Sequence, residues 1–191
     1  MNEAFSSQAE DSRRALDLIM RLEGEAAARG GRVQLLLGNH ELMNLTGDLR
    51  YVSAGEYAAF AADESPAERE EAFARYRATQ TGSVDEAAAR ADFERRYPQG
   101  FFAHRRAFAA DGRYGAWLLE KPLLALVDDS AFAHAGLAED IVELGAAGVN
   151  GELHAALVGY VGALATLIEA GVLSPGDDFY DHPALVTAFE E

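Results

Sequence analysis

Three patterns in the sequence predict an α/β fold. Two short apolar runs, residues 33–37 and 123–127, have the composition of strands that are buried on both faces. The first run follows a helical pattern and the glycines Gly30 and Gly31, which is the order of half a βαβ unit. Helical patterns fill most of the remaining chain. Because only three convincing strands are found, the sequence predicts a partial α/β layer.

The helices are expected in three stretches. Residues 12–28 carry apolar side chains at helical spacing before the two glycines. Residues 54–116 are amphipathic, with a helix start at Ser65 and Pro66 and a break at Tyr97 and Pro98, and we expect them to form a mainly helical insertion.

The last 55 residues are also expected to be mainly helical, with Asp181 capping a final helix. Their most apolar run, residues 155–168, contains two glycines and is shorter than the ~20 residues that cross a membrane. We therefore expect a core helix and no membrane contact. Between the two strands after Pro122, Asp128 and Asp129 supply hairpin-turn chemistry.

Composition restricts the classes of function. The formal net charge is −16, which excludes an electrostatic nucleic-acid binder because polyphosphate would be repelled. The chain has no cysteine, so thiol nucleophiles and zinc–thiolate sites are excluded. No signal peptide is visible, and we expect a cytoplasmic protein. No Lys or Arg follows Lys121, so bound cations or a basic partner segment would offset the repulsion among the acids beyond it.

Two groups of polar residues follow predicted strands. Gly38, Asn39, His40 and Glu41 come directly after the first predicted strand, and His134 follows the third, residues 131–133. Ligand sites in open α/β sheets lie at the carboxyl ends of the strands, so the two groups are expected to meet. An amide oxygen and an imidazole nitrogen are cation ligands, and a second imidazole is a proton donor near neutral pH.

These residues carry a resemblance to a known family. Residues 36–52, LLGNHELMNLTGDLRYV, resemble the core motif of calcineurin-like metallophosphatases, most closely the Shewanella-like protein phosphatase branch. Residues 132–137, FAHAGL, are similar to the HGGL segment of that branch with Ala135 in place of a glycine, and residues 11–18 resemble the helix after its GDxxDRG motif. The resemblance implies a metallophosphatase-type α/β sandwich.

The resemblance also implies a reaction. Two divalent ions of the Mn, Fe or Zn type, about 3.5–4 Å apart, would hydrolyse a phosphomonoester, with phosphoprotein as the favoured substrate. It makes Asn39 and His134 ligands of one ion and His40 the general acid, while Glu41 holds the loop by hydrogen bonding. One alternative is a nucleotide or dinucleoside polyphosphate hydrolase of the same superfamily. Another is a non-catalytic acidic binding module that retains the scaffold.

The sequence departs from the family where the other ligands should stand. The family's DxH and GDxxDRG motifs are absent before residue 11, and its later histidine ligand is absent after the acidic helices. We therefore expect residues 1–191 to be a single, incomplete domain that by itself is catalytically silent. Of the remaining candidates, His104 is expected to be structural, and His154 and His182 to be surface or capping residues. Arg50 is either a phosphate contact or the partner of Asp48.

Overall fold

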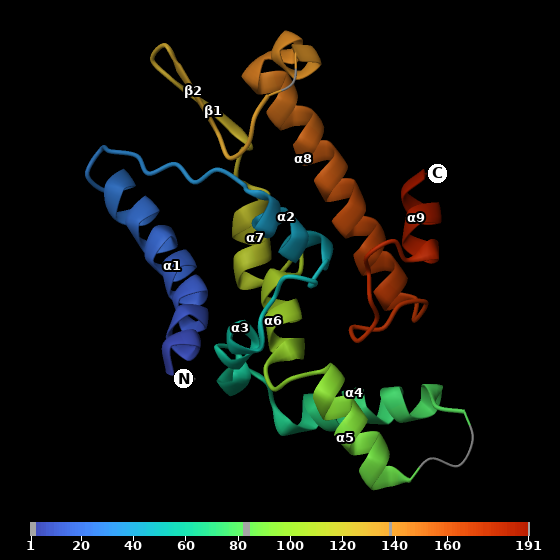
Figure 1. Ribbon diagram of the computed structural model, residues 1–191. Coiled ribbons are helices and arrows are strands. Elements are labelled where there is room, and N and C mark those ends of the chain that lie inside the picture. Colours follow the sequence, from blue (N-terminus) through green and yellow to red (C-terminus); the bar gives the residue numbers. More distant parts are fainter. Residues whose placement is uncertain (1–2, 82–84, 138, 191) are drawn as a thin grey trace. The chain divides into compact units, whose positions relative to one another are not determined.

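The computed structural model describes residues 3–81, 85–137 and 139–190. The helices and strands of these residues are labelled in Figure 1. Two compact units are formed by segments that alternate along the chain. The first unit comprises Met1–Asp17, Val52–Arg106 and Pro175–Asp177, and the second comprises Leu18–Tyr51, Ala107–Ser174 and Asp178–Glu191. Helix α1 (Glu3–Ala27) begins in the first unit and continues into the second.

Helices fill the first unit, as the sequence predicts for most of this stretch. They are α3 (Ala54–Ala58), the 3₁₀ helix η1 (Ala61–Asp63), α4 (Pro66–Thr79), α5 (Glu86–Arg96) and the beginning of α6 (Phe101–Phe108). The predicted start at Ser65 and Pro66 is confirmed, because the Ser65 hydroxyl accepts from the Glu68 N–H at 3.1 Å. The predicted break at Tyr97 and Pro98 separates α5 from α6.

A buried carboxylate joins two parts of this unit. The Glu64 side chain is fully buried, and its oxygens accept from the Gly100 and Phe102 N–H groups at 3.0 and 2.9 Å. The Arg69 guanidinium lies 3.1 Å from the same carboxylate. Glu64 therefore satisfies N–H groups at the start of α6 that would otherwise be buried without a partner.

The second unit carries the only sheet within the described residues. Strands β1 (Leu124–Val127) and β2 (Ser130–Ala133) pair antiparallel, with Val127 opposite Ser130 across the predicted turn. The hairpin is confirmed, but burial on both faces is not. Leu126, Val127 and Phe132 are 63%, 54% and 52% exposed. Their burial was predicted from apolar composition alone. Burial also requires a second layer packed on the sheet, and the described residues do not provide one.

The predicted strand at residues 33–37 does not form in the structure. The segment has no regular secondary structure, although the Leu37 side chain is buried and its N–H donates to the Pro122 carbonyl at 2.9 Å. A strand needs a neighbour along its length, and here the pairing stops after this one bond. A short apolar run also occurs in buried loops, and composition does not separate the two. The metallophosphatase-type sandwich thus stays a prediction.

Along the chain, the hairpin lies between helices. Helices α2 (Asn39–Thr46) and α7 (Arg113–Leu119) precede it, and α8 (Glu139–Glu169) and α9 (Pro183–Glu190) follow it. A core between α8 and α9 is formed by Leu164, Leu173, Phe179 and Leu185. The cap of α9 is His182, whose Nδ1 accepts from the Ala184 N–H at 3.3 Å, so the prediction of Asp181 was wrong by one residue. Asp181 has a φ of 51° instead.

Helix α8 differs from the expected core helix. Residues Glu143–Glu169 are long and apolar enough, by length and composition, to cross a membrane, and only 17% of the most apolar window is buried. The buried side chains lie along one face, at Val149, Leu157, Val161 and Leu164. Tyr160, Ala163, Leu167 and Ile168 are partly buried against the core with α9, whereas Leu144 and Val158 are exposed. Helix α8 therefore packs on the core with one face and is not surrounded by it.

Candidate functional site

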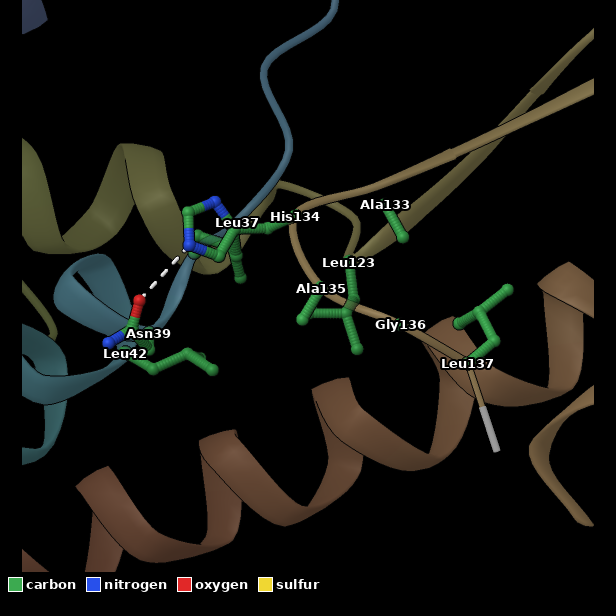
Figure 2. Close-up of a pocket in the computed structure, with 10 residues that line it drawn as sticks. Leu37, Asn39, Leu42, Leu123, Ala133, His134, Ala135, Gly136 and Leu137 are labelled. Atoms are coloured by element: carbon green, nitrogen blue, oxygen red, sulfur yellow. Dashed lines mark hydrogen bonds between the residues drawn. The ribbon is translucent and has the colours of Figure 1, made fainter. Parts of the chain in front are cut away.

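Asn39 and His134, 95 residues apart in sequence, meet at one point in the second unit. The Asn39 Oδ1 atom lies 3.1 Å from the His134 Nε2 atom, and both side chains are exposed (Figure 2). Asn39 is the first residue of α2, and His134 directly follows β2. Because the amide oxygen accepts only, Nε2 carries the proton in this hydrogen bond. The expected meeting of the two polar groups is therefore observed.

The first turn of α2 fixes Asn39. Gly38 precedes the helix with extended backbone, and its N–H donates to the Glu41 Oε2 atom at 2.9 Å. This is the loop-holding role expected of Glu41. The bond closes the N-terminal turn and sets the direction in which the Asn39 side chain leaves it.

Gly38 also makes room for the imidazole of His134. A Cβ atom at position 38 would lie 3.0 Å from both the Nδ1 and Cε1 atoms of His134, and 2.7 Å from Glu41 Oε2. The His134 ring therefore packs directly on the backbone that begins α2. A larger residue at position 38 would displace the His134 ring or the Glu41 carboxylate, whereas the backbone φ of −101° is open to any residue.

The hairpin that carries His134 is anchored by α8. The Asn150 Oδ1 atom accepts from the Leu123 and Leu124 N–H groups at 2.9 and 3.0 Å, and its Nδ2 donates to the Leu124 carbonyl at 2.7 Å. Three hydrogen bonds from one side chain thus fix the start of β1. Since β1 pairs with β2 in register, this contact positions His134 as well.

A cavity of about 330 Å³ opens beside the Asn39–His134 pair. Its lining is mainly apolar, and the two polar side chains are Asn39 and His134 (Figure 2). The other lining residues are Leu37, Gly38, Leu42, Leu123, Ala133, Ala135, Gly136 and Leu137. A polar pair set into apolar walls is typical of a ligand pocket.

His40 lies outside the residues that line this cavity. Its side chain is exposed, and its ring packs against the ring of Tyr51, with centroids 5.7 Å apart and planes inclined at 59°. No role was expected for Tyr51 from the sequence. The only signal for it was its place in the motif, eleven residues after His40.

Arg50 forms a salt bridge with Asp48, which is one of the two roles expected for it. Its Nε and Nη2 atoms donate to the two Asp48 carboxylate oxygens, both at 2.8 Å. These bonds hold the pKa of Asp48 below its usual range and raise the pKa of Arg50. The guanidinium also lies over the Tyr180 ring, 3.5 Å from its centroid.

The pair Asn39–His134 suits one metal ion of the Mn, Fe or Zn type. The 3.1 Å spacing of Asn39 Oδ1 and His134 Nε2 is that of a hydrogen bond, and it brings two potential ligand atoms together. An amide oxygen and a neutral imidazole are both ligands for such ions. Within the described residues, no group of three or more His, Asp or Glu side chains is arranged to hold a metal. The described chain thus contributes two donors.

The other histidines lie where structural roles place them. His104 is buried, with its ring edge-on to Tyr57 and Phe60, and burial lowers its pKa to about 4. His154 is exposed, and its Nδ1 lies 3.2 Å from the Leu119 carbonyl, a free carbonyl at the end of α7. His182 caps α9. All three match their expectations.

Comparison with known proteins places this chain near a phosphatase. It is 28% identical over 168 residues to Shewanella-like protein phosphatase 2 of Arabidopsis thaliana, a match that covers 77% of this chain and 39% of that protein. It is also 46% identical over 50 residues to an uncharacterised protein of Schizosaccharomyces pombe, covering 26% of this chain and 15% of the yeast protein. The chain thus spans well under half the length of these relatives. No family model matches the chain, and no solved structure matches it.

Proposed function

We propose that this chain carries one half of the active site of a metal-dependent phosphoester hydrolase, a phosphomonoesterase that acts on phosphoproteins. The observation that carries the proposal is the 3.1 Å approach of Asn39 Oδ1 and His134 Nε2 beside a cavity. The similarity to a protein named as a protein phosphatase supports the same class of reaction.

In this proposal, each residue has one task. Asn39 and His134 would hold one ion through Oδ1 and Nε2, with His134 in the neutral tautomer that carries its proton on Nδ1. His40, exposed on the first turn of α2, donates a proton to the leaving oxygen of the phosphoester. When bound, the metal pair of the family supplies a water that ionises near neutral pH and neutralises phosphate charge.

The proposal also states what the chain does alone. Its described residues supply two donors, which is fewer than a tightly held dication requires. We therefore expect weak metal binding and little turnover from residues 1–191 alone. A non-catalytic acidic module would bind a partner without His40.

The metal site is tested directly by titrating the purified chain with Mn²⁺ and recording NMR spectra. Paramagnetic broadening is expected to begin at the side-chain signals of Asn39 and His134. Asn39→Ala and His134→Ala are expected to abolish this early broadening, while the control His154→Ala, an exposed histidine of the same unit, leaves it unchanged. Broadening that begins among the acidic residues beyond Lys121, and is the same in all variants, would contradict the metal site.

The reaction is tested on the product of the whole coding region with a panel of phosphopeptides, phosphate monoesters and nucleotides. His40→Asn is expected to lower turnover on the preferred phosphopeptides by about 10²–10⁴-fold. Preference for nucleotides would instead identify the alternative hydrolase. Retained partner binding with no turnover in the natural protein would identify the binding module.

A further inference from the structure

Tyr51 is exposed to solvent and yet contacts a residue of the proposed site. Its side chain is 68% exposed, yet its ring packs against His40, the proton donor of the proposed reaction. Burial of apolar area explains little of this placement, because most of the ring faces solvent. The loop before Tyr51 must therefore hold it.

That loop is fixed at its beginning by the end of α2. Gly47 adopts the left-handed conformation, with φ 76°, and its N–H donates to the Asn44 carbonyl. A Cβ atom at Gly47 would collide with the Phe179 ring, which packs directly on this turn. The turn is thus enclosed between α2 and residues that precede α9.

The loop is fixed again one residue before Tyr51. Asp48 is 9% exposed and accepts two side-chain hydrogen bonds from Arg50, together with a 3.3 Å bond from the Arg50 N–H. The Arg50 guanidinium stacks on Tyr180. A planar fork that holds both carboxylate oxygens and lies on an aromatic ring has little freedom. Asp48, Arg50 and Tyr180 thus form a clamp.

We infer that Tyr51 is a positioning residue for His40, held in place by this clamp. The inference rests on the proposed function, in which His40 must deliver a proton along one direction. An exposed histidine on the first turn of a helix otherwise samples several rotamers, and the Tyr51 ring removes those that point across it. The ring acts through packing, so its hydroxyl is not needed.

The contact itself is tested by NMR on the 191-residue chain. An aromatic ring shifts the signals of protons near its face, so Tyr51→Leu is expected to move the ring-proton signals of His40. Tyr51→Phe is expected to leave them nearly in place. The control Phe189→Leu, which removes another exposed ring of the second unit, is expected to have no effect. Unchanged His40 signals in Tyr51→Leu would overturn the inference without affecting the proposed function.

The role in catalysis is tested on the product of the whole coding region with two kinds of phosphate monoester. Alkyl esters need a proton on the leaving oxygen, whereas nitrophenyl esters leave without one. Tyr51→Leu is expected to reduce kcat about 10-fold more on the alkyl ester, with KM little changed, and Tyr51→Phe is expected to restore it.

Equal losses on both esters would make Tyr51 merely structural and would overturn the inference. If His40→Asn lowers turnover and Tyr51→Leu does not, the inference fails while the proposed function stands. Absence of phosphatase activity in the natural protein would refute both.

Discussion

Gly38→Ala is expected to damage the Asn39–His134 site while leaving the fold intact. The added Cβ would stand 3.0 Å from His134 Nδ1 and Cε1, where ordinary contact begins at 3.4 Å. The imidazole must therefore retreat by about 0.4 Å. Movement away from α2 by that distance would lengthen the 3.1 Å bond to Asn39 to as much as about 3.5 Å, beyond the usual length of an N–H···O hydrogen bond.

The energetic effect on folding is small. The lost His134–Asn39 bond contributes about 1 kcal/mol, and the shift of the Glu41 carboxylate, 2.7 Å from the new methyl, weakens a capping bond of about the same size. We therefore expect the free energy of unfolding to fall by about 1–2 kcal/mol. Misplacing a ligand by this distance is expected to weaken Mn²⁺ binding about 10–100-fold.

The assay pairs urea unfolding with the Mn²⁺ titration. Gly136→Ala is the matched control, because it adds the same methyl two residues from His134 and meets nothing within 4 Å. The reasoning is refuted if Gly38→Ala binds Mn²⁺ as tightly as Gly136→Ala does, since His134 would then not depend on its contact with the backbone of α2.

Three further predictions concern the framework. Asn150→Ala removes three hydrogen bonds from the start of β1 and is expected to cost about 2–4 kcal/mol, seen as faster amide exchange throughout the hairpin. Burial lowers the pKa of His104 to about 4 in the folded chain, against 6.5 when unfolded. Its contribution to the free energy of unfolding is therefore complete above pH 6.5 and is lost as the pH falls towards 4. The loss is about 3 kcal/mol, measured as the difference in pH dependence of unfolding between the natural chain and His104→Phe. Glu64→Ala leaves two buried N–H groups and a guanidinium without their carboxylate and is expected to cost about 3–5 kcal/mol by thermal unfolding, whereas Glu70→Ala, in an exposed ion pair, is expected to change the unfolding temperature little.

Local chemistry made part of this structure predictable. The turn at Asp128 and Asp129 and the helix start at Ser65 depend on neighbours within three residues, and the structure contains both. The approach of Asn39 to His134 was predicted from two strands that end at one edge of a sheet. The structure has the approach but no strand before Asn39, so the reason given by the sequence does not account for it.

What the sequence could not predict depends on distant partners. Residues 33–37 look like a strand, but a strand exists only where another runs beside it. Asn150 is an unremarkable residue in a helix, and its importance comes from two backbone N–H groups 26 and 27 residues away. In our inference, Tyr51 is held in position because Arg50, the residue before it, contacts Tyr180. No pattern in the sequence near Tyr51 predicts that contact.

Because the two units alternate along the chain, the first unit can change in evolution without changing the residues of the Asn39–His134 site. Asn39 and His134 both belong to the second unit, and Val52–Arg106, which separates them in sequence, belongs to the first. The entropy of closing such an excursion rises only with the logarithm of its length, by about 0.6 kcal/mol for each doubling. Insertions, deletions or replacement within the helices of the first unit therefore change very little the entropy cost of bringing Asn39 and His134 together. Natural variants are free to diversify there while the residues around His134 keep the same arrangement.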